Sequence, residues 1–235
     1  MRYAVGWMLA RSGFVTASVS YRFTDEAVFP AQIHDVKAAV RFLRANAPRW
    51  GIDPERIGIW GHFAGGHLAA LAAVSEGIPF LEGEGGSPDE LSDVQAAVPM
   101  APPTDFLVDW YADSGYPHHG DAWSAVEGLL NGLDLDDPET RELAQLASPA
   151  HLATAGAPPI LVVHGTLDDL VPVSQGRDFV RTLLGLGVDA SLLELPHDDH
   201  GLASVYGDDP DTVTPTGQEI VDFFVRALGP VAPNS

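Results

Sequence analysis

The sequence predicts an α/β fold with a mostly parallel sheet flanked by helices. Short apolar runs alternate along the chain with segments whose apolar residues recur at helical spacing. One run, ILVV within residues 159–164, is unbroken, which is typical of a strand buried on both faces in a parallel sheet. Residues 57–73 read as a strand, a glycine-bounded turn and a helix. Together these observations predict repeated strand and helix units.

The first part of the chain contains one predicted strand between two predicted helices. Residues 3–10 are expected to form a helix that ends at Gly13, and the β-branched and aromatic run of residues 14–21 predicts a buried strand. Residues 31–47 follow a proline and predict a second helix. Its apolar side chains recur every three or four positions: Ile33, Val36, Val40 and Leu43.

The remaining elements continue the same alternation. Residues 56–61 predict a strand, and the helix after it is expected to end near Val74. Further strands are expected at residues 94–100, 159–164 and 188–195, and further helices at residues 173–184 and 217–228. Polar stretches rich in glycine and proline, at residues 76–93, 113–121 and 207–216, are expected to be surface loops, so residues 1–235 form one domain.

Composition excludes several classes of partner and site. The chain has 235 residues, with 33 Asp and Glu against 12 Lys and Arg, for a formal charge of −21. This charge repels nucleic acid and anionic membranes. There is no cysteine, which excludes disulfides, thiolate metal sites and a cysteine nucleophile. No run reaches membrane-spanning length, so the chain as given is expected to be cytoplasmic, although a missing N-terminal segment would leave room for a signal peptide.

The most informative stretch is GHFAGGHLA, which follows the predicted strand of residues 56–61. It resembles the nucleophile elbow of α/β-hydrolases, in which Gly-x-Ser-x-Gly places a serine on a strained turn between a strand and a helix. The branch of acetyl-xylan and feruloyl esterase-like proteins has GHSAGGHLA here, so Phe63 stands in the position of the nucleophile. The alternative is a glycine-flanked turn between any strand and helix, because the GxxxG spacing alone is weak evidence.

The resemblance also implies an acid and a base. In HGTLDDLVP the family's HGxxD pattern falls on Asp168, and the final His-Gly falls on His200 and Gly201. The acid would orient the imidazole of the base, which would move the proton during acyl transfer. Alternatives remain: Asp168 as the cap of a turn, and His197 as the base. A weaker alternative is a metal site, formed either by residues 197–200 or by His118 and His119. His62 and His67 are expected to pack and form hydrogen bonds.

The family resemblance implies that part of the oxyanion hole lies outside this sequence. The Ala64 N–H would supply one donor, whereas the other donors come from an HGGGW-like segment before the first helix, which the chain does not contain. The same resemblance implies that N-terminal strands are missing, one of them between residues 14–21 and the elbow strand. Residues 102–148 occupy the position where this fold inserts a cap over the site.

Two functions follow from these expectations. The first is a carboxylic ester hydrolase by family, acting on small acyl, acetyl-sugar or aryl esters, but inactive or impaired because of Phe63 and the absent oxyanion loop. The second is a non-catalytic protein that binds a small apolar ligand. A third and weaker alternative is a hydrolase in which His200 activates water directly. No cofactor and no metal are expected, and the sequence does not indicate an oligomeric state.

Overall fold

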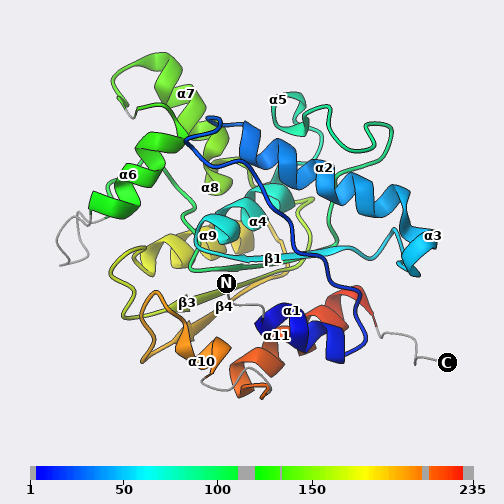
Figure 1. Cartoon of the computed structure of the whole chain (residues 1–235). Helices are drawn as coiled ribbons and strands as arrows, with labels where there is room; N and C mark the ends of the chain where they lie inside the picture. The colour runs from blue at the N-terminus through cyan, green and yellow to red at the C-terminus, as the bar shows by residue number, and fades with distance from the viewer. Residues whose placement is uncertain (1–3, 111–119, 133, 208–211, 230–235) are drawn as a thin grey trace.

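The computed structural model describes residues 4–110, 120–132, 134–207 and 212–229. Its centre is a sheet of four parallel strands in the order β1-β2-β3-β4 (Figure 1). The strands are β1 (Gly58–His62), β2 (Ala96–Met100), β3 (Ile160–Gly165) and β4 (Ala190–Leu195). The predicted parallel sheet is therefore confirmed, and its strands follow one another in space as they do in sequence.

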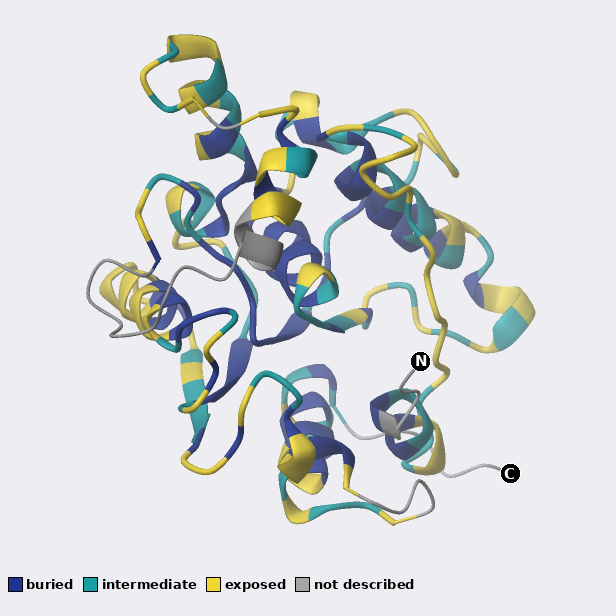
Figure 2. Ribbon diagram, turned by 60° about the vertical axis from the view of Figure 1, so that its left-hand side comes forward, coloured by how far each residue is buried: buried dark blue, intermediate teal, exposed yellow. Residues whose placement is uncertain are grey.

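Helices cover both faces of the sheet, which explains the apolar character of the strands. Every residue of β2 and β3 is buried. On one face, apolar side chains of α1 (Ala4–Arg11), α10 (Ala203–Tyr206) and α11 (Pro215–Leu228) pack on the strands. On the other lie α2 (Ala31–Ala45), α4 (Ala64–Val74), α8 (Pro149–Leu152) and α9 (Ser174–Gly185) (Figures 1 and 2). No helix among the described residues is long and apolar enough to cross a bilayer.

The remaining helices are short or lie beside this framework. They are α3 (Ala47–Trp50), α5 (Pro79–Glu82), α6 (Gly120–Leu129) and α7 (Pro138–Ala147). Apolar side chains from the region of α6 and α7 pack with those of α2 and α4, as in the contact cluster that joins Val126 and Ala144 to Ile33 and Leu71. The stretch of residues 102–148 thus lies over the α2 and α4 side of the molecule, in the parts of it that the structure describes.

The predicted strand at residues 14–21 is wrong. This segment forms no strand, and residues 15–20 are exposed (Figure 2), with Val15 58% and Val19 36% accessible. Its β-branched composition fits a strand, but a strand also requires a neighbour with which to exchange backbone hydrogen bonds. Among the described residues β1 pairs only with β2, so no ladder reaches this segment.

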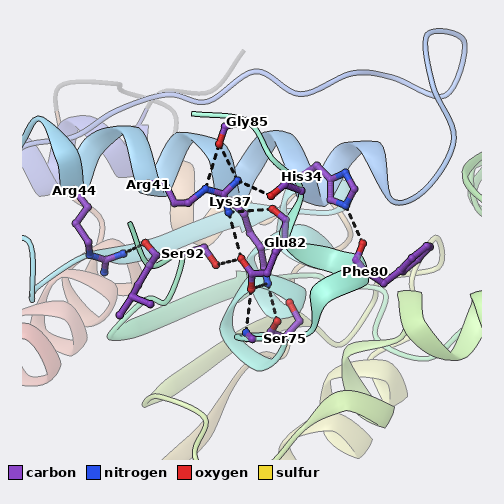
Figure 3. Close-up of polar contacts among 12 residues, drawn as sticks. His34, Lys37, Arg41, Arg44, Ser75, Phe80, Glu82, Gly85 and Ser92 are labelled. Atoms are coloured by element: carbon purple, nitrogen blue, oxygen red, sulfur yellow. Dashed lines mark hydrogen bonds and ion pairs between the residues drawn. The ribbon is translucent and has the colours of Figure 1, made fainter. Parts of the chain in front are cut away.

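A cluster of charged side chains connects α2 to the segment that leads from α4 to β2 (Figure 3). Lys37 is fully buried, and its Nζ donates to the Ser75 carbonyl at 2.6 Å and lies 2.7 Å from Glu82 Oε1. Arg41 donates to the carbonyls of Glu82 and Gly85 at 3.0 and 2.9 Å. Burial lowers the pKa of Lys37, although the hydrogen bond to Glu82 opposes the shift. The cluster therefore holds the segment between α4 and β2 against α2.

The packing of α4 against the sheet depends on two glycines. A Cβ at Gly66 would lie 2.5 Å from the Met100 carbonyl oxygen, and a Cβ at Gly61 would overlap the carbonyl of Gly65. Both obstacles are backbone atoms, which cannot rotate away as a side chain does. The start of α4 therefore touches β1 and β2 backbone to backbone.

We predict that Gly66→Ala lowers the free energy of unfolding by about 1–3 kcal/mol, because the added methyl group forces the helix away from β2. Gly65→Ala is the matched control, since a Cβ there meets no atom within 4 Å. It should leave stability unchanged or raise it by up to ~1 kcal/mol, as alanine is the better helix former. Urea unfolding measures both variants, and equal destabilisation would contradict this explanation.

Candidate active site

Phe63 occupies the turn between β1 and α4 with strained backbone angles of φ 54° and ψ −115°. Its N–H donates to the Met100 carbonyl at 2.9 Å, and its own carbonyl accepts from the His67 N–H at 2.7 Å. A bulky side chain at positive φ is uncommon and costs on the order of 1–3 kcal/mol. The turn therefore has the strained strand-to-helix geometry expected of an elbow, although the residue in it is phenylalanine.

Asp168 and His200 approach each other from the ends of neighbouring strands. Asp168 lies just after β3 and His200 lies in the loop after β4, because parallel strands bring their carboxyl ends to one edge of the sheet. His200 Nδ1 lies 2.8 Å from Asp168 Oδ2, within hydrogen-bond distance. Asp168 is 1% exposed, whereas the His200 side chain is 20% exposed. His197, the alternative base, is exposed, and the aspartate contact belongs to His200.

Asp168 accepts further hydrogen bonds that hold it in place and keep it ionised. Its Oδ1 accepts from the backbone N–H groups of Leu170 and Val171 at 3.0 and 2.8 Å. His164 Nε2 lies 3.4 Å from Oδ2. Burial alone would raise the pKa of Asp168, but the hydrogen bonds from His164 and His200 outweigh it and lower this pKa to about 2. The carboxylate is thus charged across the whole physiological range.

His164 is a contributor to the site that the sequence analysis did not single out. It is fully buried on β3, and its Nε2 lies 2.8 Å from the Val171 carbonyl as well as near Asp168. Both neighbours are acceptors, so Nε2 carries the hydrogen. The signal in the sequence is a histidine at the end of a buried strand, four residues before the acid. His164 therefore acts on the position and charge of Asp168.

The Phe63 ring packs directly on the imidazole of His200. The ring centroids are 4.9 Å apart and the planes meet at 87°, an edge-to-face arrangement. His62, the residue before Phe63, holds the same loop from another side, since its Nε2 lies 2.8 Å from the His200 carbonyl oxygen. The three elements of the expected triad therefore converge, but position 63 presents an aromatic ring without any group that exchanges a proton with His200.

An apolar cavity of about 280 Å³ lies beside the elbow. Its lining includes Phe63 and Ala64 from the turn, together with Tyr21, His67, Phe106 and Trp110. The His67 ring packs 5.0 Å from that of Phe106, and its Nδ1 lies 3.1 Å from the Pro103 carbonyl oxygen. Burial is the main cause that lowers the pKa of His67 to about 4, so its ring is neutral at physiological pH. The part of the cavity wall that His67 forms is therefore uncharged.

The residues named as alternative metal ligands have other roles or lie outside the described part. The Asp198 carboxylate accepts from the Ser204 N–H and hydroxyl at 2.8 and 2.6 Å, which fixes the start of α10. Within the residues that the structure describes, no three histidines or carboxylates are grouped as metal ligands. His118 and His119 lie outside the described residues.

Comparison with known proteins gives a consistent result. A family model described as BD-FAE matches residues 1–183. Esterase LipC of Mycobacterium tuberculosis is 34% identical over 200 residues, which are 85% of this chain and 48% of LipC. The probable carboxylic ester hydrolase LipM of the same organism is 34% identical over 195 residues, 82% of this chain and 43% of LipM. The chain therefore spans less than half the length of these curated relatives.

Solved structures extend the likeness to three dimensions. A truncated form of a carbohydrate esterase from gut microbiota superposes with a TM-score of 0.81 at 31% identity, over 95% of this chain and 78% of the other. The butyrate-bound esterase Est2 of Thermogutta terrifontis superposes with a TM-score of 0.68 at 26% identity, over 92% of this chain and 73% of the other. The four-stranded sheet and its helices thus match those of esterases with the α/β-hydrolase fold.

We predict that His67 makes the fold sensitive to acid. The pKa of His67 is about 4 in the folded chain and near 6.5 when the chain is unfolded, so protonation of this ring favours the unfolded state. The free energy of unfolding therefore keeps its full value above pH 6.5 and decreases as the pH falls towards 4. Between pH 7 and 4 the wild type should lose about 3 kcal/mol more than His67→Gln. Urea unfolding across this range measures the difference. His197→Gln, at an exposed histidine, is the control and should keep the wild-type slope.

Proposed function

This chain belongs to the BD-FAE family of α/β-hydrolases, and from that premise we propose that it derives from carboxylic ester hydrolases but does not perform their acyl-transfer reaction. The observation that carries the proposal is the Phe63 ring, packed 4.9 Å from His200 at the position of the nucleophile. Removing a triad serine costs on the order of 10⁶ in kcat in a well-measured protease. Phenylalanine adds steric obstruction to that loss.

The contact between Asp168 and His200 supports the acid and base roles in this proposal. In the proposed ancestral reaction, Asp168 holds the Nδ1–H of His200, and Nε2 takes the proton of a nucleophile at position 63. The Ala64 N–H, at the start of α4, would stabilise the oxyanion of the tetrahedral intermediate. The ancestral substrates would be small acyl, acetyl-sugar or aryl esters, for which the apolar cavity of about 280 Å³ offers a binding site. Residues 102–148 would act as the cap over that cavity.

A second candidate function is the binding of a small apolar ligand without catalysis. It is favoured by the place of Phe63, whose ring both blocks His200 and forms part of the lining of the apolar cavity. A ligand of this class would raise the melting temperature, and the stabilisation would grow with the logarithm of its concentration once that concentration exceeds its Kd. Phe63→Ser should weaken this stabilisation, because the Phe63 ring would contribute contact surface for the ligand. If the wild-type chain is not stabilised by short-chain esters or aromatic acids, this second function is contradicted.

We predict that the wild-type chain shows no labelling by serine-directed fluorophosphonates and no burst with nitrophenyl esters. Phe63→Ser should be labelled at residue 63, and Phe63→Ala, which removes the ring without adding a hydroxyl, should not be. Intact-mass spectrometry followed by peptide mapping gives the readout. Stoichiometric labelling of the wild type near the elbow would refute the proposal. Ester turnover by wild type that disappears in His200→Gln would instead favour direct activation of water.

For turnover, we predict that Phe63→Ser in the 235-residue chain stays well below an ordinary esterase value of roughly 10⁴ M⁻¹s⁻¹ in kcat/KM. The physical reason is the oxyanion hole, since the loss of one donor costs about 10²–10³ in rate. A fusion that supplies an HGGGW-like segment before residue 1 should raise the activity far more in the Phe63→Ser background than in wild type. The measurement uses a short-chain nitrophenyl ester at matched folded fraction. Full activity of the single variant would show that this view of the oxyanion hole is wrong.

A further inference from the structure

Two polar side chains in the lining of the apolar cavity beside the elbow each have an atom without a hydrogen-bond partner. Gln32 and His67 are 3% and 4% exposed, and both residues line this cavity of about 280 Å³. Gln32 Oε1 and His67 Nε2 are closed to solvent and unpaired in the part of the chain that the structure describes. The large majority of buried polar atoms are paired, so these two atoms indicate where a bound group would add a hydrogen bond.

Both unpaired atoms are hydrogen-bond acceptors. Gln32 Nε2 donates to the Ala27 carbonyl at 2.6 Å, which identifies the amide nitrogen and leaves Oε1 as the unpaired atom. His67 Nδ1 lies 3.1 Å from the Pro103 carbonyl oxygen, which only accepts, so Nδ1 carries the hydrogen. Because the His67 ring is neutral at physiological pH, its Nε2 keeps a lone pair. The partner that both atoms lack is therefore a donor.

We propose that this cavity binds an uncharged aromatic alcohol, whose hydroxyl group donates to His67 Nε2 or to Gln32 Oε1. The inference rests on the second candidate function, ligand binding without catalysis, and it names the class of ligand. An ester or an ether of the same size has only acceptors, so it leaves both atoms unpaired and binds more weakly. The preferred ligand therefore differs from the esters of the ancestral reaction.

Aromatic rings form much of the wall, which favours a ring in the ligand. The ring centroids of His67 and Phe106 are 5.0 Å apart, and those of Phe106 and Trp110 are 5.9 Å apart. Edge-to-face and offset contacts between rings stabilise beyond their buried area. A cavity of roughly 150 Å³ holds benzene, so about 280 Å³ accommodates one ring with a short carbon chain. The aromatic side chains of the described lining are Tyr21, Phe23, Phe63, His67, Phe106 and Trp110.

The charges around the cavity disfavour an ionised ligand. Among the described residues of the lining none is acidic, so a buried ammonium group would have no counter-ion. Arg22 is the one charged side chain of this described lining, and Asp35 accepts hydrogen bonds from its guanidinium at 2.9 and 2.8 Å. The formal charge of −21 repels a carboxylate. A neutral hydroxyl group avoids both penalties.

The test compares two isomers, 3-phenylpropan-1-ol and 2-phenylethyl methyl ether. They contain the same atoms, but only the alcohol has a hydrogen to donate. We expect the alcohol to bind at one ligand per chain, with a Kd at least about tenfold lower than that of the ether, as measured by isothermal titration calorimetry. The ions 3-phenylpropylammonium and 3-phenylpropanoate should also bind more weakly than the alcohol. Equal Kd values for the two isomers, or tighter binding of either ion, would overturn the proposal.

Substitutions of the acceptors test the assigned atoms. His67→Phe and Gln32→Met each remove one acceptor and keep a side chain of similar size. At least one of them should reduce the preference for the alcohol over the ether to about threefold or less. Leu129→Met, which alters the lining without touching an acceptor, should keep the wild-type preference. A ratio of two Kd values is compared in each variant, so a general loss of packing does not mimic the effect. Retention of the tenfold preference in both acceptor variants would contradict the proposal.

The same titrations distinguish failure of this inference from failure of the proposed function. If the alcohol and the ether bind equally well, ligand binding stands and the preference for a donor is wrong. A water molecule that pairs with the two acceptors would give this result. If none of the four compounds binds, the ligand-binding function and this inference are both wrong. The comparison of the isomers uses the wild-type chain, so it decides the proposal even where a variant does not fold.

Discussion

The backbone contact between the start of α4 and the sheet is the constraint on which the rest of the structure depends. Gly61 and Gly66 let the helix begin where the strand ends, without a side chain between them. The N–H and C=O of Phe63 are then both engaged, with the Met100 carbonyl and the His67 N–H. The geometry of the turn is thus determined by backbone atoms and by the neighbouring glycines. The side chain at position 63 determines whether a nucleophile is present, and its replacement by phenylalanine leaves the geometry of the turn intact.

The persistence of the acid and the base has a structural explanation. Asp168 accepts hydrogen bonds from the backbone of Leu170 and Val171, which shape the turn between β3 and α9. It also lies between His164 and His200, so its replacement would leave several buried donors unpaired. These bonds stabilise the folded chain whether or not an ester is ever cleaved. Retention of Asp168 therefore does not by itself distinguish an enzyme from a binding protein.

The fold follows from the sequence wherever the signal is local, whereas Asp168 and His200 were expected from the family resemblance. The alternation of apolar runs and helical spacing predicts the four strands and the helices around them, and the motifs after β3 and β4 predict Asp168 and His200. The strand at residues 14–21 fails because β propensity describes a side-chain preference, whereas a ladder requires a partner elsewhere. The structure agrees with the expectation that His67 packs and forms a hydrogen bond, whereas its lowered pKa and the role of His164 were not predicted. A buried histidine acquires its tautomer and its pKa from carbonyls and rings that are distant in sequence, such as Pro103 and Phe106.

The cluster around α2 has a practical consequence for studies of unfolding. Lys37 is the one lysine in the sequence, and it is fully buried with its amine against the Ser75 carbonyl and the Glu82 carboxylate. An amine-reactive reagent therefore has no accessible lysine in the native state, and Lys37 becomes modified only when α2 separates from the loop before β2. The rate at which Lys37 is modified therefore reports how often α2 separates from this loop, without any engineered probe.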